Sequence, residues 1–246
     1  MRTATSDLVR SADFIISELQ SVANPDKAAF LQRFFKTGKG EYAEGDVLLG
    51  IVVPIVRDVV KRSPPLPLSE VQRLLDSPHH EVRLAGLLLL QRQFAKAKNE
   101  AEREQVFDFY LRNAHRANNW DLVDVTCRGV VGEYLLNKPD RSILYRLAES
   151  RNLWEQRIAV VSTWTFIKHL QFDDTFALVL KLLHHPHDLM HKAMGWMLRE
   201  VGKKDRDALT DFLDQHAHRL PRTALRYSIE HFSDEERKGW LARKGE

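Results

Sequence analysis

Residues 79–90 read HHEVRLAGLLLL, a polar start followed by an apolar run. The apolar character continues to Lys96, and a segment of that length exceeds an ordinary β-strand, so it predicts a buried helix over Glu81–Lys96. The same order of a polar start, a charged residue and a long apolar stretch recurs at residues 151–161 (RNLWEQRIAVV) and 186–197 (PHDLMHKAMGWM). A helical unit that recurs along the chain is typical of repeat proteins.

The rest of the chain also shows helical periodicity, and no segment alternates polar and apolar residues in the manner of a hairpin. We therefore expect an all-helical protein. Its short helices, joined by loops of a few residues, group into pairs of roughly 35 to 45 residues, which is the size of HEAT-like repeats. Such repeats stack as a curved solenoid with a concave binding face. No linker poor in apolar residues divides the chain, so residues 1–246 are expected to form a single domain.

Cap and breaker residues set the expected helix boundaries. Ser69 followed by Gln72 resembles a capping box and predicts a short helix that starts at that point. The other helices are expected at Asp7–Ser21, Pro25–Phe35, Pro54–Arg62, Glu81–Lys96, Glu102–Ala114, Trp120 to about Asn137, Arg141–Ser150, Leu153–His169, Asp173–Leu183 and Asp188–Val201, with two or three more after Asp205, one of them opened by Pro221.

The composition narrows the class of protein. The 246 residues are 43% apolar and carry a net charge of +3, which permits a nucleic-acid partner without requiring one. The single cysteine, Cys127, excludes a disulfide framework. Apolar runs such as Leu84–Leu90 are too short to span a bilayer, and charges at Arg2 and Asp7 interrupt any signal peptide. We expect a soluble protein of the reducing cytoplasm.

Residues 118–124, NNWDLVD, read as the start of a helix with Asn119 as its N-cap. Residues four apart share a side of a helix, so Trp120 and Asp124 lie one above the other at the edge of the apolar stripe. An aromatic face beside a carboxylate suits a cationic ligand. The alternative is that Trp120 is a core residue and that Asp124 is solvated or pairs with an arginine.

Trp196 is a second unusual residue, because it lies off the apolar stripe of its helix. It shares a face with three cations, Lys192, Arg199 and Lys203. Basic residues interleaved with aromatic ones are what nucleic-acid surfaces use to follow a phosphate backbone. Gly195 is costly inside a helix and indicates close approach by a neighbour or a ligand. The alternative is that this face packs on the next repeat.

Arg157 projects onto the apolar side of its helix, where a guanidinium needs an anionic partner. That partner is either a core-facing carboxylate or a ligand phosphate, and the two interpretations converge if the acid is Asp124. Four histidines also cluster between positions 184 and 191. His187 and His191 share a helix face, but the sequence lacks the further ligands of a zinc site, so we expect a polar turn instead of a metal centre.

Together these motifs resemble the AlkD-type DNA alkylation repair proteins, a family of HEAT-like-repeat DNA glycosylases. The matching stretches are residues 120–124 (WDLVD), 153–157 (LWEQR), 192–200 (KAMGWMLRE), 40–46 (GEYAEGD) leading into 49–57 (LGIVVPIVR), and 221–227 (PRTALRY). Their order and separation, over about residues 10 to 232, make the resemblance specific although no single motif is decisive.

The resemblance implies excision of positively charged alkylated purines, of the 3-methyladenine and 7-methylguanine type, from duplex DNA, with no metal or organic cofactor. It assigns the catalytic carboxylate to Asp124, the paired aromatic platforms to Trp120 and Trp196, and the supporting arginine to Arg157. Phe34 stands where some relatives carry a tyrosine, so that hydroxyl contact is absent or comes from Tyr42, a candidate DNA contact.

Lys192, Arg199 and Lys203 are the first candidates for phosphate contacts, with salt-dependent affinity as the consequence. The expected partner is duplex DNA that contains alkylated bases, bound in the cytoplasm at the nucleoid by a monomer with no membrane and no obligate protein partner. The alternative function is a non-catalytic HEAT-like module that binds damaged or branched nucleic acid. A pure binder has no use for Asp124 facing a polyanion, so we favour the enzyme.

Overall fold

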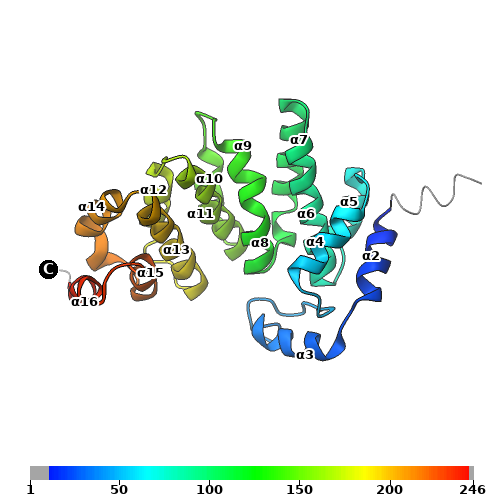
Figure 1. The fold of residues 1–246 in the computed structure, drawn as a ribbon, viewed down its shortest axis with the longest axis horizontal. Coiled ribbons are helices and arrows are strands. Elements are labelled where there is room, and N and C mark those ends of the chain that lie inside the picture. Colours follow the sequence, from blue (N-terminus) through cyan, green and yellow to red (C-terminus); the bar gives the residue numbers. More distant parts are fainter. Residues whose placement is uncertain (1–10, 244–246) are drawn as a thin grey trace, which may run out of the picture. The chain divides into compact units, whose positions relative to one another are not determined.

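The computed structural model describes residues 11–243, and helices dominate that range (Figure 1). Those residues contain no strand, and their extended pairing is limited to an isolated bridge between Val47 and His79. The expected all-helical class is confirmed. The first part of the helix expected at Asp7–Ser21 lies outside the described residues. The chain divides into two compact units, residues 1–126 and 127–246. The single domain and the curvature of the solenoid stay predictions.

The first unit is built around one buried helix, α6 (His80–Lys96), as the apolar run predicted. Nearly every residue from His80 to Leu90 is buried. Gly86 allows close packing, because a Cβ atom at this position would lie 2.9 Å from a methyl group of Leu75. The other elements of this unit are α2 (Ala12–Ser21), α3 (Pro25–Phe34), α4 (Val53–Arg62), α5 (Leu68–Leu75), α7 (Glu100–Arg112), the 3₁₀ turn η1 (Ala114–Arg116) and α8 (Trp120–Thr126).

The capping box predicted at Ser69 is wrong. Helix α5 begins one residue earlier, at Leu68, and its N-cap is Pro67, which makes no side-chain cap bond. Proline fixes its own φ, here −63°, and an extended ψ of 154° places the turn directly after it. Ser69 therefore lies inside the first turn, where its hydroxyl cannot cap the helix.

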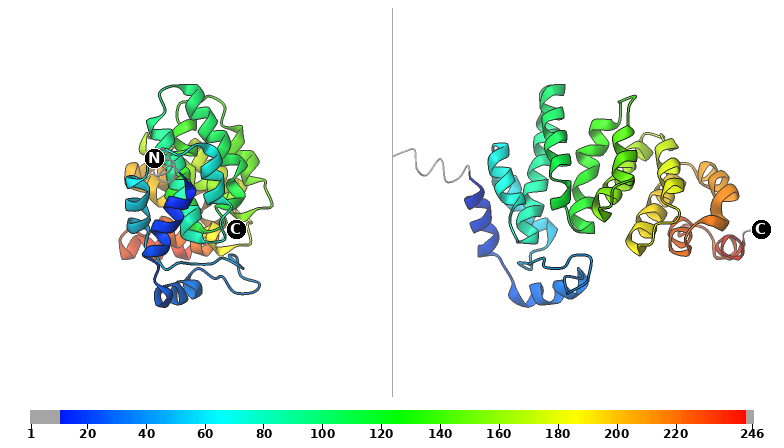
Figure 2. Two further views of the ribbon diagram at one scale, coloured as in Figure 1. Left: turned by 90° about the vertical axis from the view of Figure 1, so that its right-hand side faces the viewer. Right: turned by 180° about the vertical axis from the view of Figure 1, so that it is seen from behind.

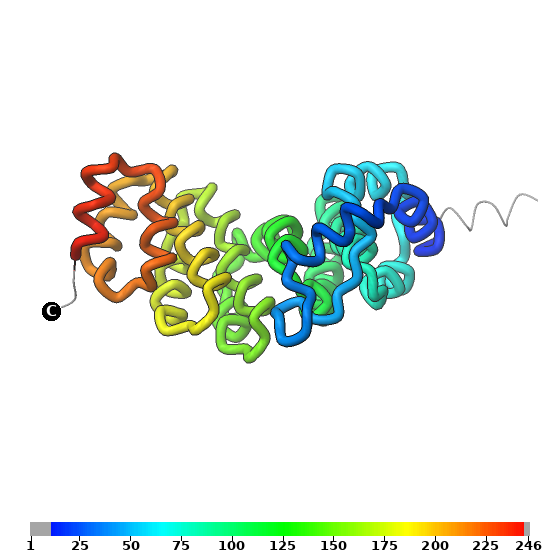
Figure 3. Tube along the Cα trace, turned by 90° about the horizontal axis from the view of Figure 1, so that it is seen from below, coloured from blue at the N-terminus to red at the C-terminus, as the bar shows by residue number. Residues whose placement is uncertain are grey.

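The chain between α3 and α4 crosses the ends at which α6 and α8 begin (Figures 1 and 3). The Glu81 carboxylate holds this crossing by accepting the backbone N–H groups of Leu49, Gly50 and Ile51 at 2.8, 2.8 and 3.1 Å. Gly50 has a φ of +79°, and a Cβ atom at this position would lie 2.2 Å from the carbonyl oxygen of Asn24. The crossing therefore needs both a buried acid and a glycine.

The second unit contains a row of three helices, α11 (Leu153–Lys168), α13 (Asp188–Lys204) and α15 (Arg222–Ser228), each packed on the next (Figure 2). Another helix precedes each of them in the sequence and packs on the row, which is the arrangement of a helical repeat. The remaining elements are η2 (Cys127–Gly129), α9 (Val131–Leu135), α10 (Ser142–Ala148), α12 (Asp173–Lys181), α14 (Arg206–His216), η3 (Ala217–Arg219) and α16 (Asp234–Ala242).

The helix expected from Trp120 to about Asn137 is divided into three pieces: α8, the 3₁₀ turn η2 and α9. The Thr126 hydroxyl bonds back to the carbonyl of Leu122 at 2.6 Å and contacts the Tyr110 hydroxyl at 3.0 Å. Back-bonding of this kind competes with a regular helix. Gly129, a poor helix former, follows within the turn. The uninterrupted helix was therefore a wrong prediction.

Candidate functional site

Trp120 opens helix α8 and lies in an aromatic cluster of the first unit. The Asn119 side chain accepts the backbone N–H of Trp120 at 2.8 Å, so Asn119 stands at the start of the helix as expected. Phe35 stacks on the indole with ring centroids 5.4 Å apart, and Phe34 meets it edge-on at 5.9 Å. The indole is half-buried. Trp120 is therefore partly a core residue, and its position is fixed by neighbours at the C-terminal end of α3.

Asp124 lies one turn after Trp120 on α8 and is half-buried. Two of the three residues between them, Leu122 and Val123, are fully buried. The carboxylate thus stands at the border of the core, as the sequence predicted. Tyr42, also half-buried, belongs to the crossing between α3 and α4.

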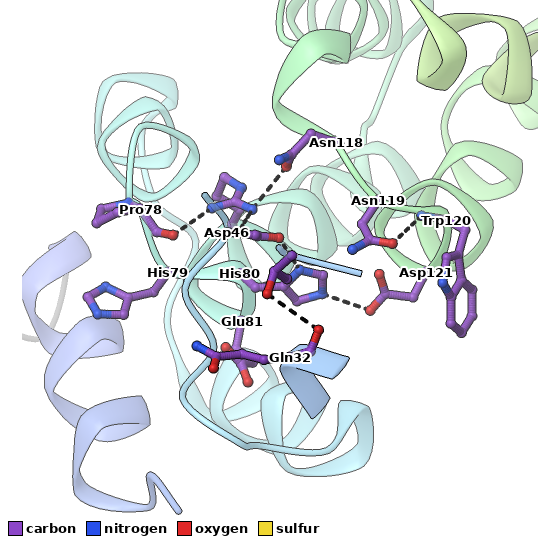
Figure 4. Close-up of polar contacts among 12 residues, drawn as sticks. Gln32, Asp46, Pro78, His79, His80, Glu81, Asn118, Asn119, Trp120 and Asp121 are labelled. Atoms are coloured by element: carbon purple, nitrogen blue, oxygen red, sulfur yellow. Dashed lines mark hydrogen bonds and ion pairs between the residues drawn. The ribbon is translucent and has the colours of Figure 1, made fainter. Parts of the chain in front are cut away.

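A buried charge network that we did not predict from the sequence underlies this aromatic cluster (Figure 4). His80, at the start of α6, is 2% exposed. Its Nδ1 lies 2.9 Å from Asp46 and its Nε2 lies 2.8 Å from Asp121. Arg83 adds bonds to Asp46 and to the Asn118 side chain. The imidazole therefore links the glycine-rich segment before α4 to the first turn of α8, next to Trp120.

The two carboxylates determine the ionisation of His80. Burial by itself lowers the pKa of the imidazole, but the hydrogen bonds with Asp121 and Asp46 outweigh it and raise that pKa to about 9. Burial by itself raises the pKa of Asp46, but the His80 bond and the Arg83 charge outweigh it and leave that pKa below its ordinary value. At neutral pH, His80 is therefore an imidazolium that donates both N–H groups.

The sequence held one clue to this network. His80, Glu81 and Arg83 are three ionisable residues in the first turn of a helix that is otherwise apolar, and all three are at most 5% exposed. A charged cluster at the start of a buried helix needs partners, because an unpaired buried charge is costly. The partners themselves lie 34 and 41 residues from His80 in sequence, which no local pattern reveals.

In the second unit, Arg157 lies on α11 and is 5% exposed, which confirms that the guanidinium is on the buried side of its helix. One of its nitrogens donates to the carbonyl of Leu189, in the first turn of α13, at 2.6 Å. This bond ties two helices of the row together and holds the guanidinium in place.

Trp196 lies on α13, outside the buried stripe and half-buried, as expected. Its indole Nε1 donates to Glu200 at 3.1 Å, and the Arg128 guanidinium lies 5.8 Å from the ring centroid. Gly195 indicated that a neighbour or a ligand approaches the helix closely, and in the structure helix α15 is that neighbour. A Cβ atom on Gly195 would lie 2.4 Å from the carbonyl oxygen of Ala224 and 2.5 Å from the Cβ of Tyr227. Packing thus fixes the position of the Trp196 backbone.

The three cations expected to share the face of Trp196 all have acidic neighbours. Lys192 pairs with Asp188 at 2.8 Å, and Lys203 pairs with Glu200 at 2.7 Å. Arg199 pairs with Glu230 and lies 3.9 Å from Glu200. Their role as phosphate contacts stays a prediction, and each contact requires a phosphate to compete with a carboxylate.

Three of the four clustered histidines organise the turn before α13. His187 caps the helix by accepting the N–H of Leu189 at 3.1 Å, and His185 accepts the N–H of His187 at the same distance. His191 bonds to the carbonyl of His185 at 2.6 Å. Burial lowers the pKa of both His185 and His187. Within the described residues, no three or more His, Cys, Asp or Glu side chains group in a way that could hold a metal ion.

The structure assigns the candidate residues to two groups. Trp120, Asp124 and Tyr42 belong to the first unit, whereas Arg157 and Trp196 lie on adjacent helices of the second. No helix in residues 11–243 is long and apolar enough to cross a membrane.

Comparison with known proteins agrees with the motifs. The family model described as DNA alkylation repair enzyme matches residues 15–232. Among solved structures, the chain is similar to a "Predicted DNA alkylation repair enzyme from Enterococcus faecalis", at 18% identity and a TM-score of 0.67, over 86% of this chain and 97% of that one. At this identity the likeness shows the fold. No curated protein sequence is similar enough to match the chain. The resemblance noted from the motifs is confirmed.

Proposed function

We propose, since the chain belongs to the family of DNA alkylation repair enzymes, that it is a monofunctional DNA glycosylase that excises positively charged alkylated purines from duplex DNA. The observation that supports this most is the pairing of Trp120 with Asp124 on one side of α8, half-buried at the edge of the core. The proposal also gives roles to Arg157 and Trp196, which lie on neighbouring helices of the second unit.

The proposed reaction hydrolyses the N-glycosidic bond. Alkylation at a ring nitrogen makes the purine cationic, so it leaves as a neutral base and takes the bonding electron pair with it. The sugar carbon becomes an oxocarbenium-like cation, which a water oxygen attacks, and the proton from that water passes to solvent. The abasic sugar and the free base are the products. This chemistry needs negative charge and π faces near the sugar, with no redox step.

Each residue has a defined role in this proposal. The Asp124 carboxylate stabilises the developing positive charge and orients the attacking water, the kind of electrostatic effect worth about 10²–10³ in rate. The indoles of Trp120 and Trp196 contact the cationic sugar and base, at about 0.5–2 kcal/mol each. The resemblance gives Arg157 the role of the supporting arginine. The reaction uses no metal or organic cofactor.

Fixed aromatic positions support the proposal. Phe35 and Phe34 hold the Trp120 ring, and the bond to Glu200 holds the Trp196 ring. Rings that are already in place need little reorganisation when the transition state forms, which is how preorganised sites gain rate.

The test is base release from a duplex that carries a single 7-methylguanine, with an undamaged duplex as the control. The proposal predicts free 7-methylguanine and an abasic site in an otherwise intact strand. Tight DNA binding with no base release would favour the non-catalytic binding module instead. Strand cleavage without an added lyase or base would contradict the monofunctional class.

A further inference from the structure

Trp164, on α11, holds two cations that the proposed mechanism does not use. The guanidinium of Arg128 lies 4.4 Å from the centroid of the indole, and the ammonium of Lys168 lies 4.8 Å from it. Arg128 also reaches Trp196, at 5.8 Å. All four residues belong to the second unit, so a continuous series of cations and indoles runs from the last turn of α11 to the proposed aromatic platform on α13.

Lys168 differs in its ion pairing from the cations on the helix of Trp196. Lys192, Arg199 and Lys203 each have a carboxylate within ion-pair distance. Lys168 is exposed, and among the described residues its ammonium contacts the ring of Trp164 and no carboxylate. An indole face attracts a cation by about 0.5–1 kcal/mol at exposed sites but leaves its charge unneutralised. Lys168 therefore keeps a full positive charge next to the proposed site.

The backbone that carries Arg128 is firmly held. Its carbonyl oxygen accepts the hydroxyl of Thr165 at 3.0 Å, and Thr165 lies on α11 one residue after Trp164. Gly132, on α9, lets the two segments approach, because a Cβ atom at this position would lie 2.5 Å from the Thr165 hydroxyl. The stack on Trp164 then restricts the guanidinium. A cation restrained in this way loses less conformational entropy when it binds an anion.

We propose that Lys168 and Arg128, positioned by Trp164, form a subsite for a backbone phosphate of the DNA beside Trp196. The inference rests on the proposed function, since it takes duplex DNA as the ligand. A planar guanidinium and an ammonium are the two side chains that bind phosphate oxygens best, the first in a bidentate manner and the second as a point charge. In the bound state the phosphodiester neutralises Lys168 and accepts hydrogen bonds from Arg128, while Trp164 continues to support both side chains from the ring side.

The test compares the affinity of the native protein and of Lys168→Gln for an undamaged duplex between 50 and 200 mM salt. Loss of one phosphate contact lowers the slope of log affinity against log salt by about 1. We expect that change, together with a 3- to 10-fold weaker affinity near 100 mM salt. Lys168→Arg should restore the slope, because it retains the charge.

The matched control is Lys138→Gln. The Lys138 ammonium lies over the ring of Tyr134 at 4.7 Å, a similar cation–π contact elsewhere in the second unit. A purely structural role for the cation–π pair predicts equal effects of the two variants on melting temperature and no effect on the salt slope. The subsite is wrong if Lys168→Gln and Lys138→Gln share the native slope.

Arg128→Gln gives an independent measurement of the same subsite and should lower the slope by about 1. If this variant fails to fold, Lys168→Gln alone decides. Base release by the native protein, measured beside the salt slope, separates this inference from the proposed function. If the native protein binds DNA but releases no base, the glycosylase proposal is wrong. The salt slope would still test the phosphate subsite in that case.

Discussion

At the scale of single residues, His80 is the most constrained side chain of the first unit. A buried imidazolium is tolerable because two carboxylates accept its N–H groups, at 2.9 and 2.8 Å. Arg83 shares one of those acids, Glu81 lies beside it on α6, and the ring of Phe35 lies 5.1 Å from the imidazole. The same Phe35 stacks on Trp120, so this charged cluster also supports the aromatic position of the proposed site.

The first prediction concerns stability against pH. Because the pKa of His80 is about 9 in the folded chain and ordinarily 6.5, the folded state binds more protons between those values. Its stabilising contribution is complete below about pH 6.5 and is lost as pH rises through about 9. Urea unfolding at pH 6.5, 7.5, 8.5 and 9.5 should show a falling free energy of unfolding over this window.

The variant His80→Gln removes the titrating group and leaves two buried carboxylates without their shared cation. We expect it to lower the free energy of unfolding at pH 7 by about 3–5 kcal/mol, the usual cost of breaking a buried ion pair. The pH dependence between 6.5 and 9.5 should flatten in the variant. An equally steep dependence in His80→Gln would show that another group is responsible.

Glu81 offers a second prediction at this scale. Its carboxylate accepts three backbone N–H groups of the segment between α3 and α4. The side-chain amide of Glu81→Gln has only one acceptor oxygen, and its NH₂ group would face backbone N–H donors. A loss of about 2–3 kcal/mol in the free energy of unfolding is expected. Amide hydrogen exchange should accelerate at Leu49, Gly50 and Ile51 first. Unchanged protection at these amides would contradict the anchoring role.

At the scale of helices, the sequence predicted the elements well where periodicity was strong. The bounds of α6, α11 and α13 differ from the expected ones by at most three residues, because long apolar stripes mark a helix clearly. The errors came from local side-chain chemistry. Pro67 is the N-cap of α5, so Ser69 lies inside the helix, and the Thr126 hydroxyl donates to the carbonyl of Leu122 on its own helix.

Helix packing also gives the third prediction, which uses two glycines with opposite surroundings. Gly195 lies against the backbone of α15. By contrast, a Cβ atom placed on Gly239, on α16, would have no atom within 4 Å. Gly195→Ala should destabilise the protein by about 1–3 kcal/mol, since the clash is with backbone. Gly239→Ala should stabilise it by about 0.5–1 kcal/mol. Chemical denaturation measures both, and a harmless Gly195→Ala would contradict the close α13–α15 packing.

At the scale of the whole molecule, the sequence indicated the helical-repeat class and the family, and the structure and the family match confirm both. It also indicated the half-buried setting of Trp120 and Asp124, because helix projection places both at the border of an apolar stripe, and it placed Trp196 outside the stripe of its own helix. It could not reveal the pairing of Asp46, His80 and Asp121, nor the contact of Arg128 with Trp164. The His80 contacts join residues 34 and 41 apart in sequence, and the Arg128 contact depends on how a broken helix redirects that side chain.

The catalytic role of Asp124 is the central claim, and the single-turnover rate of 7-methylguanine release in Asp124→Asn tests it most directly. The substitution keeps the size of the side chain and removes its negative charge. We expect a rate at least about 100-fold below that of the native protein, with affinity for undamaged duplex unchanged or higher. A variant that binds DNA and releases the base at the native rate would contradict electrostatic catalysis by this carboxylate.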